Sequence, residues 1–149
     1  KKKHVFDEDI AALVDDEIMR GQDTISIKAL RVESGTGIIP VASLTLDAGG
    51  VVKSVTTSGD GPVDAIFMAI REAYPHTANL QLFQISAVTE GTDAQAQVSV
   101  RLEENGRTVT GKASDTDTMV ATAYAYVNAL NKLLVKREKQ APEALTVAR

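Results

Sequence analysis

The stretch "SGDGPVDAIFMAI" (residues 58–70) decides how the chain is read. Two glycines flank an acidic residue, a proline follows, and an apolar helical pattern begins at once. Glycines permit a tight connection, and Pro62 suits the first position of a helix. The first turn of a helix also presents backbone N–H groups without intrahelical partners, which can hold an anion. The stretch therefore predicts a strand-to-helix connection, with an anion-binding turn as the functional alternative.

The segments around this connection alternate in the manner of strands, and the same scheme then occurs again. In the first half, three strands precede a helix at 61–74 that ends before Pro75, and "DAGG" joins the second and third strands as a hairpin turn. In the second half, three strands precede a long helix at 117–137. The strands are expected at residues 24–32, 40–46, 51–57, 79–88, 93–102 and 107–114.

The two halves align as an internal duplication. Gly59–Ile66 superimposes on Ser114–Ala121 at an offset of 55, and the hairpins fit best at 56. Both helices also carry rows of small residues at i, i+4 and i+8, which allow close packing; these rows are Ala65, Ala69 and Ala73, and Ala121, Ala125 and Ala129. We expect an α+β fold of duplicated βββα units, with about six strands and two helices packed on antiparallel sheet.

The ends of the chain differ from this repeated region. Apolar residues at helical spacing predict an N-terminal helix from Phe6 to Ile18 within a linker of residues 1–22. The main domain is expected at 23–137, with repeats at 24–75 and 78–137, and a loosely ordered tail at 138–149. Because the chain begins without methionine, we expect a fragment of a longer protein.

Composition narrows the class of function. The net charge of −4 argues against a nucleic-acid or anionic-membrane partner. No apolar run approaches the roughly 18 residues of a membrane span. The chain has no cysteine, which excludes disulfides and thiolate metal sites and favours a reducing compartment such as the cytoplasm.

The residues that could carry chemistry are few. Asp115 and Asp117 could be paired acids or metal ligands, but Asp117 before an apolar helix better suits an N-cap, and no histidine stands at ligand spacing. His4 and His76 have no evident partner and are expected at the surface. No nucleophile–base pair is evident, and no cofactor is expected. What remains suits a ligand with a charged end and an apolar body.

Three segments together resemble a known family. "SGDGPVDAIFMAI", "AVTEGTDAQAQVSVRLEENGRTVTGKASDTD" and "ATAYAYVNALNKLL" are similar, in order and spacing, to the C-terminal regulatory domain of 2-isopropylmalate synthases, a module shared with citramalate synthases. The resemblance runs from about Thr24 to Arg137. Upstream, "KKKHVFDEDIAALV" resembles the helical subdomain that joins the catalytic barrel to this domain.

The resemblance implies a function. Enzymes of this family condense acetyl-CoA with 2-oxoisovalerate in a TIM barrel that uses a divalent metal, the first committed step of leucine synthesis. That barrel is not part of this sequence, so no synthase activity is expected of these residues. The implied role is to bind L-leucine for feedback inhibition, as part of a cytoplasmic homodimer, and to act on the chain's own catalytic domain.

The resemblance also implies a leucine site near the dimer interface. The Gly-Asp-Gly-Pro turn would surround the charged end of the ligand, and Asp60 or a backbone carbonyl would receive its ammonium group. Phe83 stands where the family often has tyrosine, so a phenolic hydroxyl is absent there. The implied positions are Gly59, Asp60, Gly61, Pro62, Val63, Leu80, Phe83, Ala87, Ala94, Ala96 and Thr118.

Two alternatives stay open. The effector could be isoleucine, as in citramalate synthases, because leucine and isoleucine differ only in methyl placement. The domain could also serve dimerisation alone, without a ligand. An unrelated small enzyme is disfavoured, because the catalytic constellation is missing.

Overall fold

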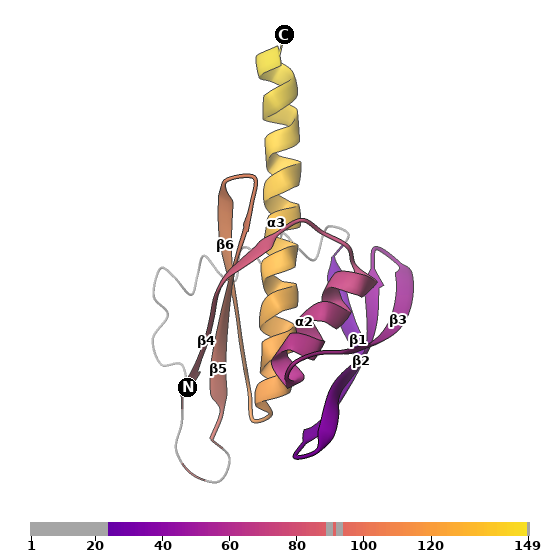
Figure 1. The fold of residues 1–149 in the computed structure, drawn as a ribbon. Coiled ribbons are helices and arrows are strands. Elements are labelled where there is room, and N and C mark those ends of the chain that lie inside the picture. Colours follow the sequence, from indigo (N-terminus) through magenta and orange to yellow (C-terminus); the bar gives the residue numbers. More distant parts are fainter. Residues whose placement is uncertain (1–23, 89–90, 92–93, 149) are drawn as a thin grey trace.

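A computed structural model describes residues 24–88, 91 and 94–148 (Figure 1). The helix expected at Phe6–Ile18 lies outside the described residues. The described chain runs through two successive sets of three strands and a helix. Its elements are β1 (Ile25–Gly35), β2 (Ile38–Ala48), β3 (Val51–Ser58), α2 (Pro62–Ala73), β4 (Asn79–Ala87), β5 (Ala96–Glu104), β6 (Arg107–Asp115) and α3 (Thr118–Ala148).

The strands form two separate antiparallel sheets. Sheet A has the order β1-β2-β3 and sheet B the order β4-β5-β6, so each sheet is a meander of consecutive strands. Each sheet is followed by its own helix. The expected α+β fold of duplicated βββα units is thereby confirmed.

The helices lie between the two sheets (Figure 1). Helix α2 packs on β2 and β3, α3 packs on β5 and β6, and the two helices contact each other. The core follows the two-residue period of the central strands, whose inward side chains are fully buried. These side chains are Ala42, Leu44 and Leu46 in β2, and Val98, Val100 and Leu102 in β5.

Small residues let the helices approach the sheets closely, as their spacing predicts. All six alanines of the two rows are buried. Opposite the second row, Gly111 of β6 lies so near α3 that a Cβ there would meet the backbone of Ala125 and Ala129. The pair of a glycine and an alanine row therefore sets the distance between α3 and sheet B.

Several boundaries differ from the sequence-based prediction: β1 and β2 extend beyond the expected residues, and larger changes affect β5 and α3. Strand β5 begins at Ala96 rather than at residue 93, because the chain first turns back from β4. Helix α3 continues to Ala148, whereas the pattern predicted its end near Arg137. Helix-favouring residues such as alanine, glutamate and lysine extend it where the apolar stripe has ended. Within the described residues, neither helix is long and apolar enough to cross a membrane.

Candidate functional site

The connection between β3 and α2 is tightly folded. The Gly59 amide donates to the Pro40 carbonyl at 3.1 Å, and the Asp60 amide donates to Asp64 Oδ2 at 2.9 Å. A Cβ at Gly59 would collide with the Asp64 carboxylate and the backbone of Ala65. Gly59 is thus required by close approach, because the turn folds back on the first turn of α2.

The two helices begin differently. Gly61 is the N-cap of α2 in extended backbone, no side chain caps this end, and a Cβ at Gly61 would meet nothing within 4 Å. At α3, Asp117 Oδ1 accepts from the amides of Met119 at 2.9 Å and Val120 at 3.3 Å, which confirms the expected N-cap. Asp115 in turn accepts from the Asp117 amide. The start of α2 is therefore the helix end with accessible space and no side-chain cap.

Several implied ligand positions meet at one end of the molecule. Ala87 pairs with Ala96, Ala96 pairs with Asp115, and Thr118 begins α3 three residues later. Ala94 lies in the connection just before β5, where it is half-buried. Figure 1 shows the end of β4 and the starts of α3 and α2 at this same lower end. The turn at 59–63 is thus on the same side as these positions.

Phe83 and Leu80 occupy different places along β4. Phe83 lies midway and makes an edge-to-face contact with Phe67 of α2, with 5.6 Å between ring centroids. A bulge between Leu80 and Leu82 brings Leu80 onto the face of Phe83. However, Leu80 is about 23 Å along the strand from Ala87, at roughly 3.3 Å per residue. The structure therefore does not bring Leu80 to the other implied positions.

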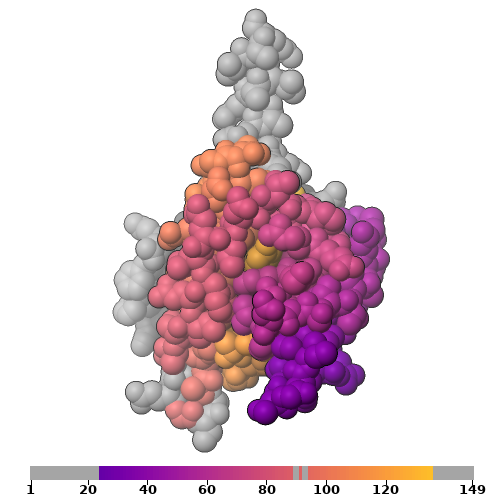
Figure 2. Space-filling view, in the orientation of Figure 1, coloured from indigo at the N-terminus to yellow at the C-terminus, as the bar shows by residue number. Residues whose placement is uncertain are grey.

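An apolar region between α2 and β4 is incompletely covered, and we call it the α2–β4 gap. Val63 lies one turn before Phe67 on α2, and Ile85 shares the face of Phe83 on β4. Figure 2 shows the yellow-orange surface of α3 between the pink surface of β4 and the magenta surface of α2. Large apolar side chains of these elements are exposed: Leu80 (41%) and Ile85 (45%) on β4, Val88 (51%) just after it, and Met68 (49%) on α2.

His76, which the sequence placed at the surface without a partner, is half-buried and bonded. Its Nδ1 lies 2.8 Å from the Tyr74 carbonyl oxygen, and its Nε2 lies 2.8 Å from the Tyr126 hydroxyl. The prediction was wrong because Tyr126 is 50 residues away and only the packing of α3 brings it near. A proline-following histidine carries no sequence signal for such a contact.

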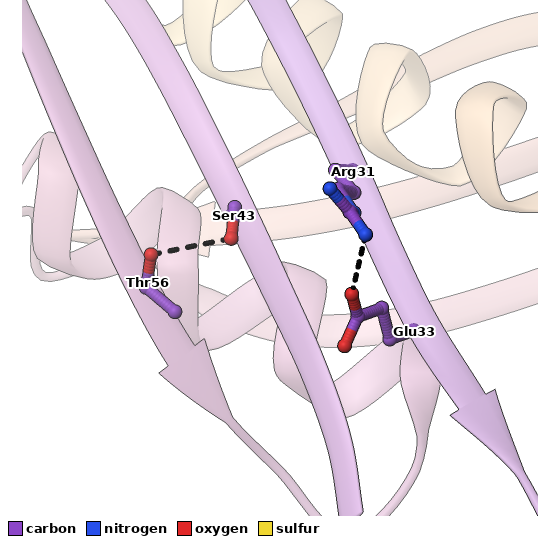
Figure 3. Close-up of polar contacts among 4 residues, drawn as sticks. All are labelled: Arg31, Glu33, Ser43 and Thr56. Carbon is purple, nitrogen blue, oxygen red and sulfur yellow. Dashed lines mark hydrogen bonds and ion pairs between the residues drawn. The ribbon is translucent and has the colours of Figure 1, made fainter.

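A second depression lies on the outer face of sheet A, with a volume of about 270 Å³. Its hydroxyls are already paired across the strands, Ser43 with Thr56 at 3.2 Å and Thr45 with Ser54 at 2.8 Å. Figure 3 shows the first of these pairs and the exposed ion pair of Arg31 and Glu33, 2.8 Å apart. None of the implied ligand positions lines this face, and its polar groups satisfy one another.

The fold and the site together define a duplicated α+β domain for ligand binding or assembly. Among the described residues, no group of three or more His, Cys, Asp or Glu side chains could hold a metal ion. The described part of the chain combines an uncapped helix N-terminus at α2 with exposed apolar side chains on β4 and α2.

Comparison with known proteins gives the family. The model of the LeuA allosteric (dimerisation) domain matches residues 4–134, and the chain belongs to this family. It is 61% identical over 144 residues to a 2-isopropylmalate synthase of Caulobacter vibrioides, covering 97% of this chain and 27% of that protein. A 2-isopropylmalate synthase of Rhodopseudomonas palustris is 50% identical over 145 residues, with 97% and 28% covered. The chain thus spans little more than a quarter of these relatives.

Proposed function

We propose that this chain is the regulatory part of a 2-isopropylmalate synthase and that it binds L-leucine for feedback inhibition. The family description names an allosteric and dimerisation domain, and relatives up to 61% identical are 2-isopropylmalate synthases. The observation that carries the proposal is the uncapped start of α2 beside the α2–β4 gap. That arrangement offers a polar environment for the charged end of a branched-chain amino acid and an apolar environment for its side chain.

The charged end of leucine would lie at the turn. Backbone N–H groups at the start of α2 favour the carboxylate by about 0.3–1 kcal/mol, or more when the site is partly buried. The carboxylates of Asp60 and Asp64 flank the same turn and favour the ammonium group. A carboxylate without an ammonium group would be repelled by these two acids, so the turn suits a zwitterion.

The isobutyl group would enter the gap. Removing such a group from water contributes about 1.5–3 kcal/mol. Val63, Phe67 and Phe83 provide apolar contact, and the small side chains of Ala87 and Ala96 leave space at the end nearest the turn. Pro62, Ala94 and Thr118 complete the proposed site, whereas Leu80 belongs to the opposite end of β4.

The gap is open on one side in a single chain, and we propose that a second copy covers it. Exposed apolar side chains on β4 and α2 are unusual for a surface that stays in water. A homodimer would bury them and enclose the ligand, in agreement with the dimerisation role in the family description.

The reaction itself belongs to the remainder of such an enzyme. We propose that the condensation of acetyl-CoA with 2-oxoisovalerate, the divalent metal and the barrel that would hold it belong to the part of such an enzyme that this chain does not span. The described residues offer no group of metal ligands. We propose that this chain has a regulatory role in a cytoplasmic enzyme, in keeping with the family description of an allosteric domain.

Thermal unfolding tests the proposal. The melting temperature is measured with L-leucine, L-isoleucine, L-valine and 2-oxoisovalerate. A ligand at 100 times its Kd adds about 2.7 kcal/mol of stability, so leucine should raise the melting temperature by several degrees. The largest shift with isoleucine would favour a citramalate synthase effector instead. No shift with any amino acid, for a chain that is still dimeric, would favour a dimerisation domain alone.

A further inference from the structure

The β2–β3 hairpin of the first repeat and the β5–β6 hairpin of the second close with the same kind of turn. The turn residues are Gly49–Gly50 in the first hairpin and Asn105–Gly106 in the second. Their φ values are 62° and 90° in the first turn, and 54° and 81° in the second, as a type I′ turn requires. Asn105 is the only residue other than glycine with positive φ in the described part of the chain. The two repeats therefore share the turn but differ in its first residue.

Each turn is also held by an acidic side chain three residues before its second glycine. The Gly50 amide donates to Asp47 Oδ1 at 2.9 Å, and the Gly106 amide donates to Glu103 Oε2 at 2.8 Å. We call the second of these hydrogen bonds the Glu103 clasp. The two hairpins are thus equivalent in backbone and in hydrogen bonding, and the asparagine distinguishes the second hairpin from the first.

An asparagine that precedes a glycine can react with its own backbone. The glycine nitrogen, having lost its hydrogen, attacks Cγ of the asparagine; the bond from Cγ to the side-chain nitrogen breaks, and ammonia leaves with, in net terms, the hydrogen lost by the glycine. Water then adds to either carbonyl carbon of the resulting succinimide, which opens to aspartate or isoaspartate. Glycine has no side chain to obstruct the attacking nitrogen. Of the four asparagines in the chain, only Asn105 precedes a glycine.

The folded turn both exposes and opposes this reaction. Asn105 and Gly106 are exposed, so the water that the reaction consumes has access to them. The attacking nitrogen, however, must first lose the hydrogen that it donates in the Glu103 clasp. The anion left on that nitrogen would lie beside a carboxylate, and two like charges at this distance repel each other. The clasp therefore disfavours the reactive form of the Gly106 amide.

We propose that Asn105 is a site of spontaneous deamidation and that the Glu103 clasp restrains this reaction in the folded chain. Either product places a new negative charge between Glu104 and Arg107, and isoaspartate also inserts a backbone carbon into a two-residue turn that sets the register of β5 and β6. The turn lies at the opposite end of these strands from Ala96, so the proposal does not depend on leucine binding.

The test incubates the chain at mildly alkaline pH, where amides lose hydrogen more readily, and follows each asparagine by peptide mapping with mass spectrometry. The replacement of an amide by a carboxylate changes the peptide mass. In Glu103→Ala, deamidation at Asn105 should be about two- to tenfold faster than in the wild type, the effect of losing one hydrogen bond. Asp47→Ala is the matched control, because it removes the equivalent bond from a turn without asparagine. Its rate at Asn105 should equal that of the wild type.

Two further measurements complete the test. Asn105→Gly carries the residue that the first repeat has at this position, so it should fold as the wild type does and show no modification in this turn. The wild-type chain unfolded in urea has neither turn nor clasp, so Asn105 should deamidate there faster than in the folded chain and faster than the other asparagines. This comparison decides the point even if Glu103→Ala does not fold.

Three results would overturn the inference. The first is a rate at Asn105 in the unfolded chain that is no higher than at the other asparagines. The second is an equal rate at Asn105 in the folded and unfolded wild type. The third is a rate in folded Glu103→Ala that is equal to or below the wild-type rate, which would mean that the carboxylate does not restrain the reaction. Isomerisation at Asp60–Gly61 starts from a carboxylate and leaves the mass unchanged, so it is not counted.

Discussion

Asn131 of α3 forms both backbone hydrogen bonds of Ile25, the first residue of β1. Its Oδ1 accepts from the Ile25 amide at 2.8 Å, and its Nδ2 donates to the Ile25 carbonyl at 2.9 Å. Asn131 is 8% exposed and Ile25 is also buried. The side chain acts as the partner that a neighbouring strand would otherwise provide, and it ties the helix of the second repeat to the sheet of the first.

Replacing Asn131 by Ala should destabilise the domain strongly. The variant leaves a buried N–H and a buried C=O unpaired, and each unpaired group costs about 1–3 kcal/mol. Urea unfolding should show a loss of at least about 2 kcal/mol. Asn128→Ala is the matched control, because Asn128 lies on the same helix and makes one exposed bond to the Lys112 carbonyl. Equal losses in the two variants would contradict the role of Asn131.

The two glycines of the turn should respond differently to a methyl group. Gly59→Ala forces the Cβ against Ala65 and Asp64 and should cost about 1–3 kcal/mol, as overpacking does. Gly61→Ala adds its Cβ in open space on extended backbone, so stability should change by less than about 1 kcal/mol.

The Gly61 variant also tests the site. Its methyl group would occupy the space in front of the first turn of α2, so leucine affinity should fall although the fold is intact. Calorimetric titration of the Gly61→Ala chain measures this directly. Unchanged affinity would place the ligand away from this helix end.

Removing the cap of α3 should weaken the domain moderately. Asp117→Ala loses the two hydrogen bonds to the amides of Met119 and Val120, a change that costs about 0.5–2 kcal/mol. Asp117→Asn keeps an oxygen acceptor and should lose much less. Chemical unfolding measures the free energy of unfolding of the two variants. Equal losses of stability in both would mean that the charge of Asp117 matters more than its hydrogen bonds.

Stability should fall at alkaline pH through Tyr126. Burial raises the pKa of the Tyr126 hydroxyl, and the nearby Arg71 only partly offsets this. The folded state therefore keeps the proton after the unfolded chain has begun to lose it near pH 10, so stability is full below about pH 10 and declines above it. Tyr126→Phe should flatten this decline. Because Tyr74 and Tyr124 remain in the variant, an unchanged slope would exclude Tyr126 as the cause.

The sequence predicted the fold well because its signals are local. Alternation in the strands, the "DAGG" turn, Pro62 at the start of α2 and the Asp117 cap each depend on neighbouring residues, and each is confirmed. The buried alanine rows were also predictable, because their spacing of four residues is visible in the local sequence. Long-range pairs carry no local signal, so Asn131 with Ile25 and His76 with Tyr126 were not foreseen.

The implied site stays a prediction, and the structure adds how far apart its positions lie. Family resemblance identifies site positions in the sequence. It does not say how far apart these positions lie in space, which depends on the folded structure. Leu80 and Ala87 both belong to β4 and face the same way, yet they stand at its opposite ends. From the sequence, Gly59 suggested a residue that permits an unusual turn conformation. The structure shows a different reason, because a Cβ at Gly59 would collide with Asp64 and Ala65.

The most direct test of leucine binding at the start of α2 is a titration of the nitrogen-15-labelled chain with L-leucine, followed by backbone amide resonances. The account predicts the largest saturable shifts at Gly59, Gly61, Val63 and Asp64, smaller ones along β4 near Ala87, and little change on the outer face of sheet A. Saturable shifts confined to other regions, or no shifts at millimolar leucine in a dimeric chain, would contradict it.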